Sequence, residues 1–334
     1  MKYELPHNEV QMSDTTGSWP IAAALHQFAS PANQHAPAEA WLATLREVAG
    51  VGFEHIDLTD SWLQIGDLSP ARLTQFAEAA AEAQVGVPSL SITRRSVIDP
   101  VDGVDNLAYT HRTMDAAATL GTRVLSLGLH RPLTADQKSQ LWFWNADSDG
   151  DPEDSPETRA LAVSRFREIG QHAADLGMLV SLELYEDTYL GTADSAVQLI
   201  TEIDLPNVGL DPDIGNLVRL HRPIEDWREI LAKTLPYTNY WQVKNYFRDE
   251  DPITGAVFAA PAPLMLGFIN YREAVRDALA IGFRGVICCE HYGGDGLGVS
   301  AMNADYLRTL LPASLPPAPV GASAVDAARQ GVTA

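Results

Sequence analysis

The chain has 334 residues, of which 46% are hydrophobic and 20% are charged, and its formal net charge is −21 at pH 7. This composition provides a large apolar core and is typical of a globular protein. The strong negative charge disfavours binding to nucleic acid or to an anionic membrane, because both require basic surfaces that displace counterions. The sequence also contains no apolar stretch long enough to span a bilayer.

The start of the chain and its cysteines predict a protein of the reducing cytoplasm. Residues 1–18 are polar and lack the apolar centre of a secretory signal, so we expect a short N-terminal extension there. Cys288 and Cys289 are adjacent. Neighbouring residues of a strand point to opposite faces, so a disulfide framework is not expected.

From Trp19 onward, short apolar runs alternate with longer amphipathic ones, which is typical of repeated strand–helix units. The expected strands are 21–28, 53–58, 87–92, 123–129, 179–184, 208–213, 240–244 and 285–290. The expected helices are 38–49, 69–83, 106–120, 155–176, 193–203, 223–234, 271–281 and 299–311. These repeats predict an α/β fold, a closed (β/α)8 TIM barrel over residues 19–311. An open dinucleotide-binding sheet is disfavoured because no G-x-G-x-x-G follows the first strand.

Two connections are longer than the usual strand-to-helix loop of about two to six residues. They cover residues 130–154 and 246–268, and both leave the carboxyl end of a strand. Because active sites of TIM barrels lie on that face, we expect both loops to wall or cover a pocket. Residues 312–334 are rich in Pro and Ala and predict a mobile tail.

Four polar residues end four consecutive strands of the second half of the chain: Glu183, Asp213, Gln242 and Glu290. In a closed barrel these strand ends open onto one face. Each residue alone could simply cap its strand, but four in succession favour a shared site. Three carboxylates brought together there would repel one another unless a cation lay between them, so the pattern predicts a divalent metal.

The motifs around these residues resemble those of the xylose isomerase-like TIM barrel superfamily of sugar isomerases and epimerases. The fifth strand, LVSLE, resembles the strand with the metal-binding glutamate, and CCEHYGGD resembles the closing one. VGLDPDIGNL resembles the Asp-x-x-His/Asn signature, with Asp213 and Asn216, and WQVKN resembles the His-x-Lys-Asp motif. Two departures stand out, because Gln242 replaces a common metal-binding histidine and Asn245 replaces a usual aspartate.

The resemblance implies that Glu183, Asp213, Gln242 and Glu290 hold the metal. An amide in place of an imidazole leaves only oxygen ligands, which suits Mn²⁺, or alternatively Mg²⁺, better than zinc. Asp211 is a rival ligand, and Asp213 is preferred for its spacing to Asn216. The cation would polarise a sugar carbonyl and its neighbouring hydroxyl, and Glu183 and Glu290 would exchange the proton beside that carbonyl.

Other residues are candidates for acid–base work or for binding the substrate. His130 ends the fourth strand and is the preferred additional base, although it could also be a solvated loop residue. His26 ends the first strand. His291 follows Glu290 and faces away from the metal unless the strand has already turned. Lys244 shares a face with Gln242 and could hold a substrate oxygen.

The sequence QLWFWN within the first long loop is dense in aromatic residues, including Trp142 and Trp144. It could anchor the loop on the barrel, or stack on an apolar substrate or another subunit. The second possibility favours a resemblance to the α subunit of bacterial C-glycoside deglycosidases. That resemblance implies Mn²⁺, a small β-rich partner subunit, and a lyase acting on a 3-oxo-glucoside with an aromatic aglycone, with His130 as the base. The alternatives are a keto-sugar isomerase or epimerase and a non-catalytic binding barrel; in each case we expect an oligomer.

Overall fold

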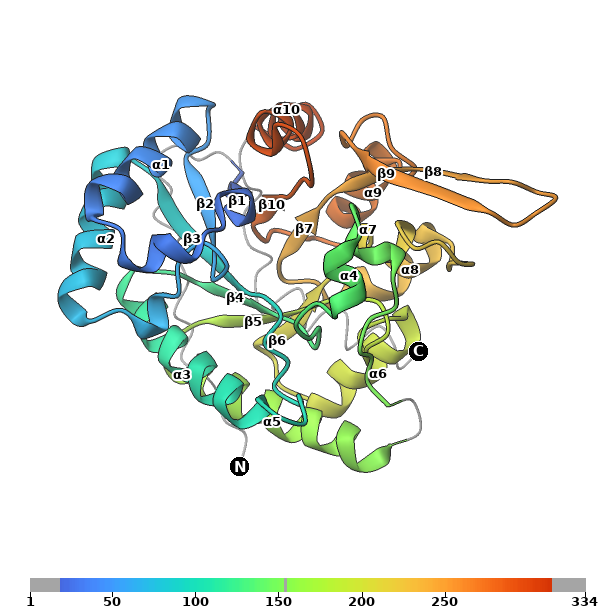
Figure 1. Cartoon of the computed structure of the whole chain (residues 1–334), viewed down its shortest axis with the longest axis horizontal. Helices are drawn as coiled ribbons and strands as arrows, with labels where there is room; N and C mark the ends of the chain where they lie inside the picture. The colour runs from blue at the N-terminus through green and yellow to red at the C-terminus, as the bar shows by residue number, and fades with distance from the viewer. Residues whose placement is uncertain (1–18, 153–154, 314–334) are drawn as a thin grey trace.

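The computed structural model describes residues 19–152 and 155–313, which fold as a barrel (Figure 1). Its strands are β1 (Ile21–Ala24), β2 (His55–Thr59), β3 (Gly86–Ile92), β4 (Val124–Leu127), β5 (Leu179–Glu183), β6 (Val208–Asp211), β7 (Trp241–Val243) and β10 (Ile287–Cys289). They form one parallel eight-stranded sheet in the order β6-β5-β4-β3-β2-β1-β10-β7. The expected (β/α)8 architecture is therefore confirmed. Every strand lies within one or two residues of its expected start, and most end earlier.

The barrel closes between β6 and β7. A hydrogen bond to a side chain there replaces part of the backbone hydrogen bonding between strands. Among the described residues, one isolated bridge joins Leu210 of β6 to Thr238, which precedes β7. In addition, the backbone N–H of Gln242 donates to Asp211 Oδ1 at 2.7 Å. Asp211 thus contributes to closing the barrel, which favours Asp213 over Asp211 as the site's carboxylate.

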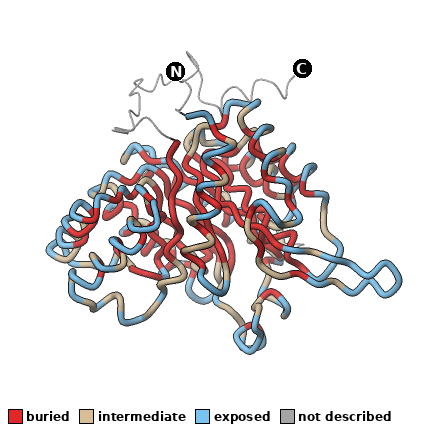
Figure 2. The backbone as a smooth tube through the Cα atoms, turned by 90° about the horizontal axis from the view of Figure 1, so that it is seen from above, coloured by how far each residue is buried: buried red, intermediate tan, exposed pale blue. Residues whose placement is uncertain are grey.

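Eight helices surround the strands: α1 (Ala38–Gly50), α2 (Pro70–Ala83), α3 (Gly103–Thr119), α5 (Pro156–Asp175), α6 (Ala193–Ile203), α8 (Trp227–Thr234), α9 (Tyr271–Ala280) and α10 (Gly296–Arg308). Figure 2 shows buried strands inside and partly exposed helices outside. The side chains of Ser69, Ser155 and Thr192 cap α2, α5 and α6. The last helix begins three residues earlier than expected, because Asp295 accepts a hydrogen bond from the N–H of Gly298.

The two long connections contain more regular structure than the sequence suggested. The first includes α4 (Ala135–Ser139), which starts with a capping box of Thr134 and Gln137, and a short 3-10 helix, Phe143–Asn145. The second contains two antiparallel strands, β8 (Asn245–Glu250) and β9 (Val257–Ala262). These strands form a hairpin that projects away from the barrel (Figure 1). The expectation that all of 246–268 walls a pocket is therefore wrong for the outer part of the hairpin.

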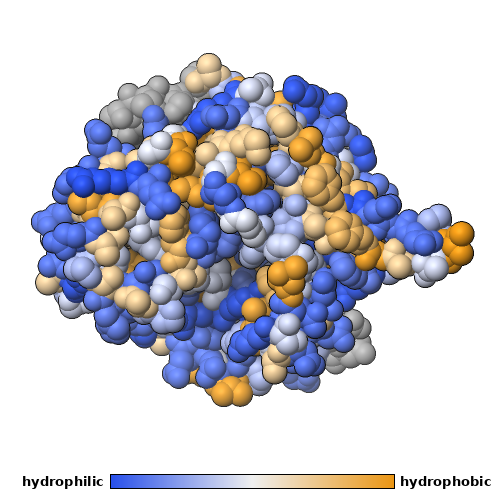
Figure 3. All heavy atoms as spheres, turned by 45° about the horizontal axis from the view of Figure 1, so that its top comes forward, coloured by the Kyte–Doolittle hydropathy of each residue, from blue (hydrophilic) through white to orange (hydrophobic). Residues whose placement is uncertain are grey.

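The projecting hairpin carries apolar side chains in solvent, which Figure 3 shows as orange surface at its outer end. Among them Ile253 is 92% exposed and Phe258 is 61% exposed. Residues 1–18 and nearly all of the expected tail at 312–334 lie outside the described residues. In the described part of the chain, no helix is long and apolar enough to cross a membrane.

Asn245 fixes the base of the hairpin and explains why the usual aspartate is absent. Its Nδ2 donates to the carbonyl oxygens of Leu264 at 2.8 Å and Ile269 at 2.9 Å. Its Oδ1 accepts from the backbone N–H of Ile269 and of Tyr246, both at 3.0 Å. A carboxylate could accept the latter two bonds but could not donate the former.

We predict that Asn245→Ala lowers the free energy of unfolding by about 2–4 kcal/mol, because it leaves buried backbone groups without partners. Asn245→Asp should also destabilise the protein, since its carboxylate faces two carbonyl oxygens. Urea unfolding of both variants tests this, with the exposed surface change Glu47→Gln as the control. Wild-type stability of Asn245→Ala would contradict the assigned role.

Candidate functional site

Lys244, which follows β7, lies between two of the expected carboxylates at the mouth of the barrel. Its Nζ is 2.7 Å from Asp213 Oδ2 and also pairs with Glu290 Oε2. All three side chains are buried. Parallel strands β6, β7 and β10 end on the same face, and so residues far apart in the sequence meet there.

Glu183 and Gln242 complete the group of residues expected from the strand ends. Glu183 Oε1 accepts a hydrogen bond from Asn216 Nδ2 at 2.8 Å, and the same nitrogen donates to the carbonyl of Leu184. Asn216 therefore orients Glu183. Gln242 Nε2 donates to Ser91 Oγ at 3.3 Å, whereas Gln242 Oε1 is buried with no hydrogen-bond partner among the described residues.

Burial and the surplus of negative charge set the protonation of these groups. Burial raises the pKa of Glu183 to about 8, with Asp213 and Glu290 adding to the rise. Burial likewise raises the pKa of Asp213 to about 7, against the attraction of Lys244. For Glu290, burial is outweighed by Lys244 and His26, which lower its pKa to about 2. Burial alone would lower the pKa of Lys244, but Asp213 and Glu290 raise it well above its ordinary value.

The structure places the three candidate histidines differently. His26 Nδ1 is 3.7 Å from Glu290 Oε1, while its Nε2 donates to the carbonyl of His291 at 2.9 Å. His291 thus supports His26 through its backbone. His130 is buried and stacks on Tyr185, with ring centroids 4.4 Å apart. Burial and three nearby cations hold the pKa of His130 well below its ordinary value, so its ring is neutral.

The aromatic residues of the first long connection form a wall over the site. The rings of Trp142 and Trp144 stack with centroids 5.1 Å apart. Trp144 also packs edge-on against Tyr246 at 5.4 Å and against Tyr292 at 5.9 Å, and Tyr292 lies 5.2 Å from Lys244 Nζ. This packing places Trp144 beside Tyr246 and Tyr292, while coverage of the site by residues 130–154 as a whole stays a prediction. Stacking on a substrate stays a prediction.

Sequence reasoning missed two arginines beside the site. Arg219 is fully buried, and its Nη2 donates to Glu186 Oε1 at 2.9 Å and to Oε2 at 3.0 Å. Arg94 donates to the hydroxyl of Tyr185 at 3.0 Å and has a positive φ of 54°, a conformation that is unusual outside glycine. The position of Arg219 inside the apolar run NLVRL indicates from the sequence that this charge is buried. The sequence does not indicate that its partner is Glu186, which lies 33 residues away.

The donor set fits a hard divalent cation in its chemistry. Its members offer only oxygen atoms, carry more negative charge than Lys244 balances, and include the unpartnered buried atoms Gln242 Oε1 and Asp213 Oδ1. The described residues contain no ready-made cluster of three acidic, histidine or cysteine ligands, because Lys244 holds Asp213 and Glu290. A cation binding to all four residues therefore requires the ammonium group of Lys244 to withdraw.

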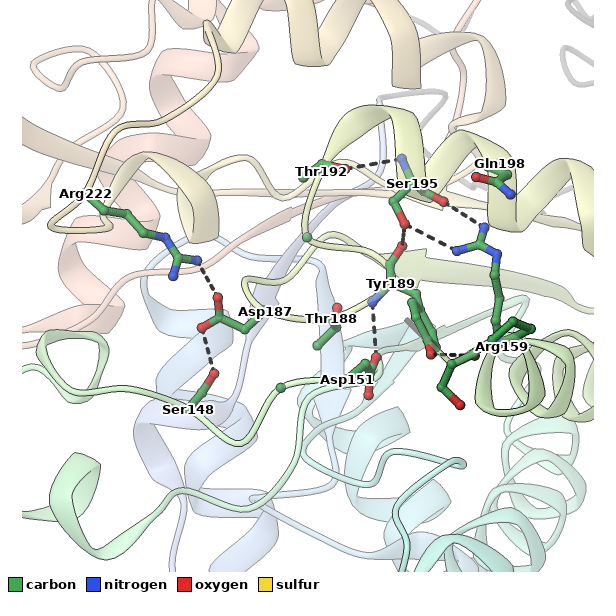
Figure 4. A pocket seen from close by; sticks show the side chains of 14 residues that line it. Ser148, Asp151, Arg159, Asp187, Thr188, Tyr189, Thr192, Ser195, Gln198 and Arg222 are labelled. Atoms are coloured by element: carbon green, nitrogen blue, oxygen red, sulfur yellow. Dashed lines mark hydrogen bonds and ion pairs between the residues drawn. The ribbon is translucent and has the colours of Figure 1, made fainter. Parts of the chain in front are cut away.

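A hollow of about 990 Å³ lies elsewhere on the rim, between the connections that follow β4 and β5 (Figure 4). None of the expected site residues lines it. Its charged groups satisfy one another, as Arg222 pairs with Asp187 at 2.5 Å and Asp151 accepts from the N–H of Tyr189 at 3.1 Å. The hollow therefore has fewer buried polar atoms without a partner than the barrel mouth.

Comparisons with known proteins agree with this geometry. A family model described as xylose isomerase-like TIM barrel matches residues 45–310. A xylose isomerase-like TIM barrel protein from Mycobacterium smegmatis, solved in complex with magnesium, is 45% identical. The match covers 87% of this chain and 96% of that one, with a TM-score of 0.84. A comparison with curated proteins finds no significant match.

More distant solved structures share the fold alone. The 3-keto-D-glucoside 4-epimerase of E. coli is 16% identical, with a TM-score of 0.61 over 87% of this chain and 99% of that one. A probable 3-DHS dehydratase from Bacillus anthracis is also 16% identical, with a TM-score of 0.61 over 86% and 98% of the two chains.

Proposed function

The chain belongs to the xylose isomerase-like TIM barrel family, and we propose that it is a divalent-metal-dependent enzyme. Its substrate would be a sugar or a related polyhydroxy carbonyl compound, and its reaction a proton transfer beside the carbonyl. The observation that carries this proposal is the buried pairing of Lys244 with Asp213 and Glu290, with Glu183 close enough to interact electrostatically with all three.

The cation would be held by oxygens of Glu183, Asp213, Gln242 and Glu290. The magnesium in the structure of the M. smegmatis relative supports a divalent ion here, and the oxygen donors are compatible with either Mn²⁺ or Mg²⁺. When bound, such an ion acts as a Lewis acid on a carbonyl and its adjacent hydroxyl. We retain Mn²⁺ as the preferred ion.

The chain's own residues supply the proton transfer. Glu183 and Glu290 reach the site from β5 and β10, with β6 and β7 between them around the barrel. They can therefore approach a bound substrate from different sides, so that one removes the proton and the other returns one. Lys244, freed from the carboxylates, can stabilise negative charge on a substrate oxygen. The low exposure of these side chains, 2–7%, keeps water away.

The finer proposal is a lyase that expels an aromatic aglycone from a 3-oxo-glucoside, with a small β-rich partner subunit, in the cytoplasm. Its support is the wall that includes Trp142 and Trp144, because aromatic rings stack well on a flat leaving group. Neutral His130 would be the base for this reaction. A keto-sugar isomerase or epimerase would use the same proton transfer without expelling a group. Release of free aglycone distinguishes the two enzymes.

We predict that Glu183→Gln and Glu290→Gln each slow exchange of the proton beside the carbonyl by about 100-fold or more, a usual scale for loss of a general acid or base. The assay follows loss of the carbon-bound proton by NMR in D2O, using ketoses and 3-oxo-glucosides with Mn²⁺ or Mg²⁺. The exposed variant Glu47→Gln is the control. Exchange at the wild-type rate in both active-site variants would refute the roles assigned to them.

We also predict that cation affinity rises between pH 6 and pH 8. The raised pKa values of Glu183, about 8, and Asp213, about 7, mean that both carboxyls hold protons at the lower pH. Those protons must leave before the oxygens can bind a cation. Calorimetric titration with Mn²⁺ in buffers of different ionisation enthalpy measures affinity and proton release together. A constant affinity without proton release would contradict the proposed ligands.

A further inference from the structure

Arg219 has hydrogen-bonding capacity that the protein leaves unused. It follows the short helix α7 (Gly215–Val218), and its side chain is completely buried. Only Nη2 has a partner, the carboxylate of Glu186, whereas Nε and Nη1 have none among the described residues. A buried donor without a partner costs about 1–3 kcal/mol, so this arrangement is expected where a ligand completes it.

Two other buried donors lie beside this guanidinium group. The indole nitrogen of Trp144 has no hydrogen-bond partner among the described residues, and the hydroxyl of Tyr246 interacts with Arg219 itself. Their rings are 5.4 Å apart, and the Trp144 ring is 5.0 Å from the guanidinium carbon of Arg219. The buried region beneath the aromatic wall is therefore rich in donors and suits a ligand group that accepts several hydrogen bonds.

The charges around the aromatic wall are also positive on balance. The guanidinium carbon of Arg94 lies 4.7 Å from the centre of Phe143, and that of Arg219 lies 4.8 Å from the same ring. Glu186 balances one of these two cations. The neighbouring part of the site, around Glu183, Asp213 and Glu290, is acidic, and Arg219 acts electrostatically on Asp213 and Glu290.

We propose that Arg219 is a substrate-binding residue that selects a carboxylate, so that the substrate is a sugar acid or another carboxylated polyhydroxy carbonyl compound. This inference rests on the proposed function for the position of the reacting carbonyl, at the acidic end of the site. The carboxylate lies at the other end and accepts hydrogen bonds from Arg219, with Tyr246 or Trp144 as further donors. Charge-assisted hydrogen bonds of this kind are stronger than those to a neutral hydroxyl.

The test compares binding of two probes, D-fructose and D-fructuronate, in which a carboxylate replaces the terminal hydroxymethyl group. Affinities are measured by calorimetry with the full chain in saturating Mg²⁺. We expect the acid to bind at least about 10-fold more tightly than the neutral sugar. Equal affinities, or no measurable binding of the acid, would overturn the proposal; neither result depends on a variant that has to fold.

A paired variant separates Arg219 from the cation as the carboxylate's partner. Arg219→Gln with Glu186→Gln removes both charges of the buried pair, so that no carboxylate is left unpaired. We expect the preference for the acid to fall to near one. The control is Arg46→Gln with Glu82→Gln, which removes an exposed ion pair and should keep the preference. A preference retained in the Arg219 variant would place the carboxylate on the cation and overturn the assignment.

These binding results are independent of proton exchange. Loss of the carboxylate preference with exchange intact would refute only the substrate class. Suppose that the acid binds more tightly than the neutral sugar, but that proton exchange does not depend on Glu183 or Glu290. This result would refute the proposed reaction and leave Arg219 as a binding residue.

Discussion

The pairing of Lys244 with Asp213 and Glu290 is the interaction on which the rest of the site depends. Burying a charge is unfavourable unless an opposite charge is close, and here one ammonium group serves two carboxylates. Burial raises the pKa of Glu183 to about 8 despite the attraction of Lys244, and the charges of Asp213 and Glu290 add to the rise. A divalent ion that replaced the ammonium group of Lys244 would compensate the charge of the same carboxylates.

The barrel brings these charged residues together at the ends of its strands. Other polar side chains hold the strands and the carboxylates in position. Asp211 closes the seam between β6 and β7 by accepting the N–H of Gln242, and Asn216 orients Glu183. Both residues belong to the motif around Asp213, and in the structure their hydrogen bonds serve to close the barrel and to orient Glu183. A motif of this kind therefore combines residues that maintain the fold with residues that are candidates for binding a ligand.

The sequence was sufficient for the barrel and for the residues at the strand ends, because short apolar runs that end in a polar residue mark buried parallel strands. It was insufficient for the hairpin of β8 and β9, since YFRDE and VFAAPA lie in a segment with several prolines and no clear alternation. It also could not reveal Arg219. The importance of that residue arises from Glu186 and the aromatic wall, and these contacts exist only in three dimensions.

The most direct measurement of the central claim is a crystal structure of the protein with Mn²⁺, using anomalous scattering to locate the ion. The account predicts one manganese site bounded by oxygens of Glu183, Asp213, Gln242 and Glu290, with the ammonium group of Lys244 moved away from Asp213 and Glu290. A structure in which Lys244 keeps both ion pairs, and manganese binds elsewhere or not at all, would contradict it.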